Sequence, residues 1–288
     1  MNNQNDNQTI EHEREDRFVG ERIYYDKKTV YFFPIDKTTI DRQEKMHYLC
    51  GLLWQTNFSA PIHERLLEGA KVLDIGCGAG IWIQDMCMSY PSSTFYGVDI
   101  NSQLFPSREH TPKNSELITC NVLNGLPFPS EWFDFVHVGE KISRQSNTFI
   151  KSTNSHIIKD TISCYVIYST TMDKKLIRVC KVNGWIEHME WDAKFINESP
   201  NLKKLTDAIV EFTASKNINA MFADKLEQLL IDTQVFSKVY HESKYCPVGS
   251  WFGDYGSLAV KIFLDSVLCL RDQLSKVMNI TTEGINIL

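Results

Sequence analysis

The chain has 288 residues, of which 43% are hydrophobic and 23% are charged, and its formal net charge is −6. This length and composition fit one large globular domain or two small ones, with enough apolar material for a core. A slightly acidic chain has no broad basic surface, so we do not expect phosphate backbones or anionic lipids to organise its function. We therefore do not expect nucleic acid as a partner.

The eight cysteines form neither a CxxC pair nor a cluster with histidine at zinc-ligand spacing. Most of them stand in apolar segments, where reduced thiols are commonly buried. We therefore expect no metal site, and a reducing compartment, either cytoplasm or nucleus. The sequence has no apolar run typical of a signal peptide or a membrane span, so we expect no membrane attachment.

The first part of the chain divides into a polar tail and a helical region. Residues 1–20 are rich in Asn, Gln, Asp and Glu, which predicts a disordered tail before a domain over 21–288. Apolar residues at helical intervals then predict a helix over 36–54 and a short one over 62–67. Because these helices precede the first predicted strand, we expect them to form an N-terminal helical cap.

From residue 71 onward, apolar runs alternate with helical segments, which is typical of a parallel α/β sheet. Strands are predicted over 71–75, 95–100, 117–122, 133–138, 185–191 and 235–245. Helices are predicted over 80–89, 174–181, 201–233 and 258–277. Gly184 is the expected stop signal of the second of these helices. The order predicts a Rossmann-like fold.

The first predicted strand leads into a helix through a glycine-rich loop, Asp74-Ile-Gly-Cys-Gly-Ala-Gly80. Glycine lets a ligand approach the backbone closely, and the helix N-terminus offers free N–H groups. A dinucleotide-binding loop has the spacing G-x-G-x-x-G, which would require glycine where this chain has Ile81. The spacing here is G-x-G-x-G, and the Asp74 carboxylate suits the amino group of a bound amino acid. The pattern favours S-adenosylmethionine over NAD.

Residues at the ends of the next two strands support this interpretation. Asp99 stands where a carboxylate accepts hydrogen bonds from both ribose hydroxyls, and Asn121 stands where an amide reaches the edge of adenine. As alternatives, Asp99 is a helix cap and Asn121 a turn residue. The predicted cofactor-binding residues are Asp74, Gly76, Cys77, Gly78, Gly80, Asp99, Ile100, Asn121 and Val122.

We assign no catalytic residue. Methyl transfer from a sulfonium is an in-line displacement, which requires alignment of donor and acceptor rather than covalent or metal chemistry. His137 lies in an apolar strand, where a lone histidine is more commonly a hydrogen-bonded core residue than a base. Tyr24 and Tyr25 are candidates to close over the cofactor, with plain aromatic packing as the alternative. The segment 245–253, rich in glycine and aromatic residues, is our candidate acceptor loop.

A series of short motifs carries a family resemblance. They are Arg22-Ile-Tyr24, Pro34-Ile-Asp36, Asp41-Arg42, Lys71 to Gly80, Asp85-Met86, Tyr90-Pro91, Gly97-Val-Asp99-Ile100, Asn121-Val-Leu123, Leu126-Pro-Phe-Pro129, Phe133-Asp134, Arg178-Val179 and Gly184-Trp-Ile-Glu187 with Glu190. With them the chain resembles the class I methyltransferases common in fungi, a group that includes the LaeA-like regulators of secondary metabolism. The resemblance implies a seven-stranded, mostly parallel sheet whose last strand is antiparallel, and S-adenosylmethionine as methyl donor.

The function that follows is methyl transfer to an unknown small-molecule or protein acceptor. The alternative is a catalytically silent cofactor-binding or scaffold protein of the same fold, which acts through a protein partner. An NAD-linked oxidoreductase is disfavoured by Ile81. Calorimetry with S-adenosylhomocysteine separates these classes.

The chain departs from the family pattern over residues 139–172. Where relatives have a short loop and a helix, this chain has a polar stretch followed by a β-branched run, and the turn over 181–184 has lost a proline and a glycine. One interpretation is a lineage-specific insertion that forms a lid or partner surface, because long loops in compact domains are often functional. The other is a nonfunctional segment that replaces part of a helix beside the active site.

Overall fold

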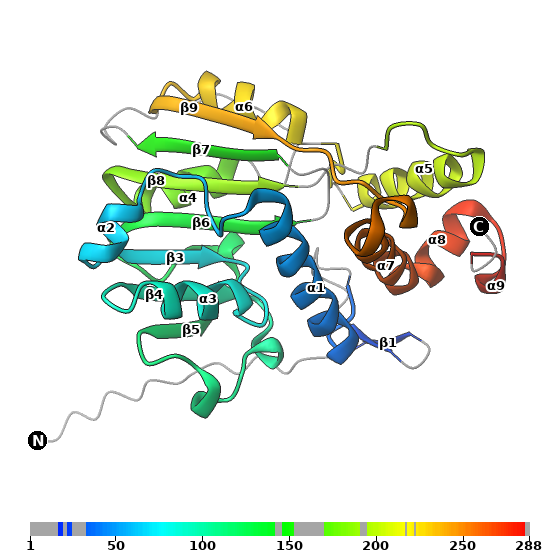
Figure 1. Cartoon of the computed structure of the whole chain (residues 1–288), viewed down its shortest axis with the longest axis horizontal. Helices are drawn as coiled ribbons and strands as arrows, with labels where there is room; N and C mark the ends of the chain where they lie inside the picture. Colours follow the sequence, from blue (N-terminus) through cyan, green and yellow to red (C-terminus); the bar gives the residue numbers. More distant parts are fainter. Residues whose placement is uncertain are drawn as a thin grey trace, which may run out of the picture.

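The computed structural model describes residues 17–19, 22–24, 33–141, 146–152, 170–190, 195–216, 218–221 and 223–285. Its main sheet has the strand order β5-β4-β3-β6-β8-β7-β9 (Figure 1). The strands are β3 (Lys71–Ile75), β4 (Thr94–Asp99), β5 (Ser115–Thr119), β6 (Phe133–Lys141), β7 (Ser146–Ser152), β8 (Cys180–Glu190) and β9 (Phe236–Ser243). A separate antiparallel pair joins β1 (Arg17–Val19) to β2 (Arg22–Tyr24). Residues 17–19, which we assigned to the tail, therefore form a strand.

Five neighbouring strands, β5, β4, β3, β6 and β8, run parallel. The parallel α/β architecture is confirmed, and it follows from the sequence because β3 and most of β6 are buried apolar runs. The expected arrangement of the outer strands is wrong. β7 is antiparallel to both β8 and β9, so the antiparallel strand comes from the middle of the chain and the last strand does not have that role.

The strand β7 belongs to the atypical segment 139–172. It lies between β8 and β9, so β9 joins the sheet only through it. Residues 142–145 and 153–169 lie outside the described residues. The described residues of the segment therefore include a whole strand of the sheet, which neither of our two interpretations anticipated.

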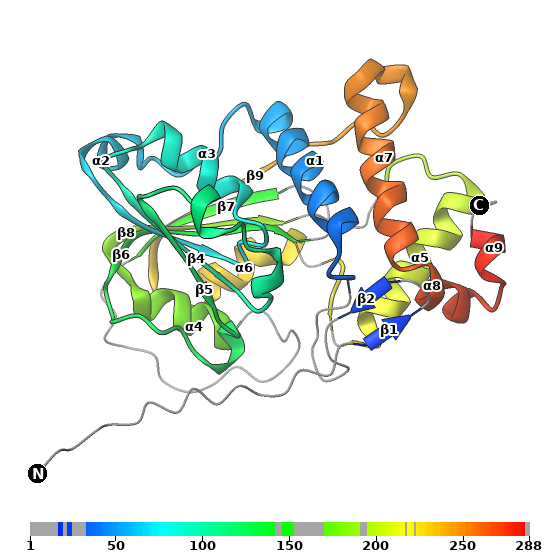
Figure 2. The same cartoon turned by 90° about the horizontal axis from the view of Figure 1, so that it is seen from below.

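Helices cover both faces of the sheet, and Figure 2 shows one helical layer on each side of it. One face packs against α4 (Thr170–Val179) and α6 (Ala223–Asp232), and the other against α2 (His63–Glu68) and α3 (Ile81–Ser89). The remaining helices are α1 (Lys37–Trp54), α5 (Pro200–Ala214), α7 (Gly253–Cys269), α8 (Arg271–Met278), α9 (Thr282–Ile285) and the short 3-10 helices η1 (Ser102–Leu104), η2 (Arg108–His110), η3 (Val122–Asn124) and η4 (Ser250–Phe252). The helices α5, α7, α8 and α9 gather beyond the carboxyl ends of the parallel strands (Figure 1).

Two long helices predicted from periodicity are each divided. The Asn219 side chain accepts a hydrogen bond from the Met221 N–H, which stabilises a turn between α5 and α6. The helix predicted over 258–277 begins earlier, at Gly253, and is interrupted at Leu270, where α7 ends and α8 follows. Periodicity does not reveal such breaks because the apolar spacing continues across them.

Gly184 is not a helix stop, contrary to our expectation. The helix α4 ends at Val179 and β8 follows at once, with Gly184 buried inside it. The neighbouring Asn183 has a φ of 63°, in the left-handed region that asparagine tolerates better than most residues. A Cβ on Gly184 would lie 2.7 Å from the Cys180 sulfur and 3.0 Å from the Asp134 carbonyl oxygen. Close packing, rather than helix termination, therefore explains the glycine.

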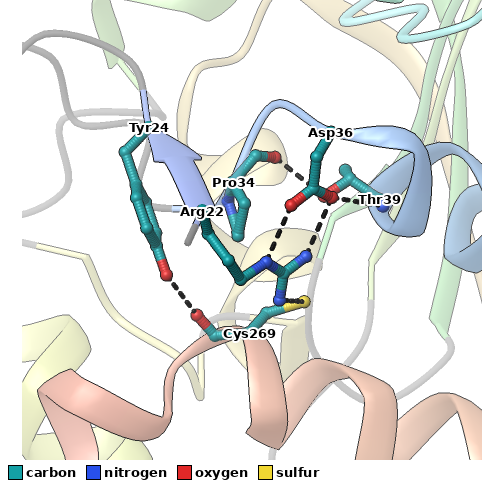
Figure 3. A network of polar contacts seen from close by, with 6 residues as sticks. All are labelled: Arg22, Tyr24, Pro34, Asp36, Thr39 and Cys269. Atoms are coloured by element: carbon teal, nitrogen blue, oxygen red, sulfur yellow. Dashed lines mark hydrogen bonds and ion pairs between the residues drawn. The ribbon is translucent and has the colours of Figure 1, made fainter. Parts of the chain in front are cut away.

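A polar network joins the start of α1 to the end of α7 (Figure 3). Arg22 donates from Nε and Nη2 to the two carboxylate oxygens of Asp36, at 2.7 and 2.9 Å, and from Nη1 to the Cys269 sulfur at 3.2 Å. Asp36 is also the N-cap of α1 and accepts from the Thr39 N–H at 3.1 Å. Tyr24 donates its hydroxyl to the Cys269 carbonyl at 3.0 Å. The network fixes α1 against the C-terminal helices.

Replacing Asp36 tests the ion pair and the cap separately. Burial alone would raise the pKa of Asp36, but the hydrogen bonds from Arg22 and Thr39 outweigh it and hold the pKa below its ordinary value. We expect Asp36→Ala to lose both interactions and about 2 kcal/mol of unfolding free energy, and Asp36→Asn to retain the cap and lose less.

The depressed pKa also sets the sign of a pH effect. The contribution of the ionised carboxylate is present above its unfolded pKa of about 4 and is lost as pH falls through the lower folded value. The stability difference between wild type and Asp36→Asn should therefore be constant near neutral pH and shrink on acidification, measured by urea unfolding. A difference that grows below pH 4 would contradict this account.

A proline substitution in β7 tests whether this strand anchors the edge of the sheet. Because β7 has a neighbour on each side, each of its N–H groups faces a partner strand. Thr148→Pro removes one of these donors and should lower the melting temperature by several degrees, whereas Thr148→Val should not. Equal melting temperatures for the two variants would show that β7 contributes little to the fold.

Candidate functional site

The three glycines of the loop after β3 all have left-handed backbone conformations. The φ angles of Gly76, Gly78 and Gly80 are 69°, 54° and 73°. Side chains with a Cβ pay roughly 1–2 kcal/mol for this conformation, so the spacing G-x-G-x-G is a backbone requirement here. Gly80 is also the N-cap of α3, so the loop delivers the chain directly into the helix.

Hydrogen bonds from the loop to β4 hold it in place. The N–H groups of Gly76 and Cys77 both donate to the Val98 carbonyl, at 2.7 and 3.1 Å. The Gly78 N–H donates to Oδ2 of Asp99 at 2.9 Å, while Oδ1 of Asp99 accepts from the Asn101 N–H at 2.8 Å. The Asp99 carboxylate therefore fixes the loop from the neighbouring strand.

A cleft opens between this loop and α1. Its lining residues come from α1 and the segment after it, from β3 and its loop, from α3, and from the ends of β6 and β8. They are Gln43, His47, Cys50, Gly51, Thr56, Asn57, Asp74, Gly76, Cys77, Gly78, Ile81, Trp82, His137, Gly139 and Met189. The cleft thus lies at the carboxyl edge of the parallel strands, where open α/β sheets commonly bind ligands.

The predicted cofactor residues fall into two groups. Those that line the cleft are Asp74, Gly76, Cys77 and Gly78, and those that do not are Gly80, Asp99, Ile100, Asn121 and Val122. In the second group, Gly80 is the N-cap of α3. The other four residues stand at the adjacent ends of β4 and β5, which are connected by a hydrogen bond of 2.8 Å from the Cys120 N–H to the Asp99 carbonyl. The structure therefore places the two groups at the same edge of the sheet, and their roles toward a ligand stay predictions.

The turn after β5 has its own hydrogen bonds. The side chain of Asn121 accepts from the Leu123 N–H at 3.0 Å and caps η3, which is the turn role that we gave as the alternative. Lys175 on α4 donates to the Val122 carbonyl at 3.0 Å and also to the Leu123 carbonyl. These contacts join the turn to α4.

Sequence reasoning missed Gln43, which comes from α1 and lies over the glycine loop. Its Oε1 accepts from the Ala79 N–H at 3.3 Å. A Cβ added to Gly78 would lie 2.7 Å from this same oxygen, so the Gln43 amide occupies the space that glycine leaves open. Four residues along α1, His47 bonds Asp85 of α3 at 2.8 Å. The resemblance at Asp41-Arg42 was the nearest signal in the sequence, but it did not include these side chains.

His137 is buried, as expected of a core histidine, but it also lines the cleft. Its Nδ1 lies 2.9 Å from Oδ1 of Asp74, and its ring stacks on Trp82 with centroids 4.0 Å apart and planes 6° from parallel. The indole Nε1 of Trp82 in turn donates to the Asn57 carbonyl at 2.7 Å. The floor of the cleft is therefore a fixed arrangement of carboxylate, imidazole and indole.

Comparison with known proteins finds similarity to methyltransferases. Residues 72–156 match the family model described as a methyltransferase domain. The chain is 23% identical over 227 residues to the methyltransferase str2 of Strobilurus tenacellus, an alignment that covers 77% of this chain and 72% of that protein. It is 30% identical over 115 residues to the secondary metabolism regulator laeA of Coprinopsis cinerea, covering 38% of this chain and 28% of that protein.

Residues 72–156 are thus similar to a methyltransferase domain, and a longer part of the chain is similar to a fungal methyltransferase. A third relative is the N-methyltransferase verN of Clonostachys rogersoniana, 25% identical over 57% of this chain and 50% of that protein. The chain thus spans half or less of the length of two of these three relatives. Among solved structures, the plantazolicin methyltransferase BpumL is similar over 80% of this chain and 83% of its own, with 10% identity and a TM-score of 0.46.

Two further sequence expectations concern residues that do not line the cleft. Tyr24 is buried and bonded to Cys269, so plain packing describes it, and Tyr25 lies outside the described residues. The expected acceptor loop 245–253 packs beside α1 and α7, and none of its residues is among those that line the cleft. Trp251 in this loop is 75% exposed.

Within the described part of the chain, no group of three or more His, Cys, Asp or Glu side chains could hold a metal ion. The described helices also include none that is long and apolar enough to cross a membrane.

The contact between Gly78 and Gln43 can be measured as a coupling. Gly78→Ala should reduce the unfolding free energy by about 2 kcal/mol, from the left-handed backbone and from displacement of Gln43 from the Ala79 N–H. In a Gln43→Ala background the same change should cost about 1 kcal/mol less, because that hydrogen bond is already absent. Urea unfolding of the two single variants and the double variant gives this difference, and strictly additive costs would rule the contact out.

Proposed function

We propose that the protein transfers a methyl group from S-adenosylmethionine to a small-molecule or protein acceptor that is still to be identified. The observation that carries the proposal is the preformed glycine loop beside the Asp74 carboxylate, at the carboxyl edge of a parallel sheet. The family match supports it, because residues 72–156 include this loop, Asp99 and His137.

The residues of the cleft suit the parts of this cofactor. Asp74 and the backbone of Gly76 to Gly78 would hold its amino-acid part, because a carboxylate pairs with an amino group and glycine admits close approach. Asp99 would bind the ribose hydroxyls, and Asn121 with Val122 would contact adenine. When bound, S-adenosylmethionine supplies an activated methyl group on a sulfonium sulfur.

The protein's own contribution is positioning and exclusion of water, since an in-line displacement depends mainly on alignment. Three hydrogen bonds fix the segment over residues 57–60, which includes the cleft residue Asn57. Glu187, fully buried on β8, accepts from the N–H groups of Ser59 and Ala60 at 3.0 and 2.8 Å, and Trp82 donates to the Asn57 carbonyl. The cleft wall therefore keeps its shape.

We further propose a cytoplasmic or nuclear location. The support is that the seven cysteines within the described residues are all free thiols, which is typical of proteins in a reducing compartment.

Calorimetry with S-adenosylhomocysteine tests the proposal directly. We expect micromolar binding to the wild type and at least about a hundredfold loss in Asp99→Ala, which removes two charge-assisted acceptors. Asp207→Ala, in an exposed ion pair on α5, is the matched control and should bind like wild type. If the wild type binds no S-adenosylhomocysteine, the proposed function is wrong. Binding without methyl transfer to any acceptor would favour the catalytically silent alternative.

A further inference from the structure

Two carboxylate side chains and one imidazole form a row across the centre of the sheet. Asp74 on β3 is the register partner of His137 on β6, and His137 is the partner of Glu187 on β8. All three are buried, with exposed fractions of 3%, 2% and 0%. Buried ionisable groups are costly unless they are hydrogen-bonded, so their placement in one row needs an explanation.

Glu187 has a structural partner in the backbone of Ser59 and Ala60, but the pair Asp74–His137 is different because it lines the cleft. An ionised carboxylate only accepts hydrogen bonds, so the 2.9 Å contact requires the proton on His137 Nδ1. Stacking on Trp82 fixes the plane of the imidazole ring, and with it the direction of this N–H. The ring therefore dictates the rotamer of the carboxylate.

The two carboxylate oxygens of Asp74 differ in their hydrogen bonds. Oδ1 of Asp74 is bonded to His137, whereas no hydrogen bond engages Oδ2 among the residues that the structure describes. Asp74 lines the cleft together with Gly76 and Gly78. We propose that His137 is a positioning residue, which holds Asp74 so that Oδ2 receives the amino group of the methyl donor.

This inference rests on the proposed function, and it predicts a defect confined to one part of the ligand. The amino-acid portion of S-adenosylhomocysteine would meet Asp74, whereas 5′-methylthioadenosine contains the adenosine but no amino acid. Without the His137 donor, the buried carboxylate loses the bond that fixes its orientation. The affinity for S-adenosylhomocysteine should then fall, while the affinity for 5′-methylthioadenosine is retained.

Two substitutions separate the hydrogen bond from the bulk of the ring. His137→Phe keeps an aromatic ring against Trp82 but has no donor, while His137→Asn places an amide N–H close to the position of the imidazole Nδ1–H. We expect His137→Phe to bind S-adenosylhomocysteine about ten- to a hundredfold more weakly than wild type, the range for a hydrogen bond to a charged group. His137→Asn should recover most of this loss, and 5′-methylthioadenosine should bind all three proteins within about threefold.

Calorimetry with both ligands, accompanied by thermal melts, decides the question. Equal losses for both ligands in His137→Phe, or no loss for either, would overturn the positioning role. A loss in His137→Asn as large as in His137→Phe, at an unchanged melting temperature, would also overturn it. If the wild type binds neither ligand, the failure is that of the proposed function instead.

Discussion

The site depends on one backbone constraint, the left-handed conformation of alternate residues in the loop after β3. Glycine at 76, 78 and 80 satisfies it, and the Val98 carbonyl and the Asp99 carboxylate then fix the loop by accepting its N–H groups. Because these bonds lie within the protein, the loop has its shape before any ligand arrives, which lowers the ordering cost of binding. The positions of α3, whose N-cap is Gly80, and of Gln43 above the loop follow from that shape.

Sequence reasoning succeeded where the cause is local. The β3 strand was predicted over the residues that form it, because a short apolar run followed by glycines allows few alternatives. It failed at the outer edge of the sheet. The polar segment Ser146–Ser152 becomes a strand through pairing on both sides with β8 and β9, and such pairing depends on strands distant in sequence. The breaks between α5 and α6 and between α7 and α8 were not predicted, because the apolar spacing continues across both turns.

The cofactor loop could be predicted, but the side chains around it could not. Asp74 meets His137 because β3 and β6 are parallel neighbours in a particular register, which no spacing in the sequence specifies. The position of His137 in an apolar strand correctly predicted a hydrogen-bonded core histidine. The sequence did not reveal that its partner is Asp74, a residue that lines the cleft. The contact of Gln43 with the loop could not be predicted either, because it depends on how α1 packs against α3.

The residues that line the cleft come partly from the matched region and partly from outside it. The matched domain, residues 72–156, contributes the glycine loop, Trp82 and His137, whereas Gln43, His47 and Met189 stand outside it. Those outer residues lie on α1 and β8, and α1 is held at its first turn by the network of Arg22, Asp36 and Cys269 (Figure 3). Because a displacement of α1 would move Gln43 relative to Ala79, the distant network and the loop are mechanically connected. The shape of the cleft therefore depends on the anchoring of this helix as well as on the glycine loop.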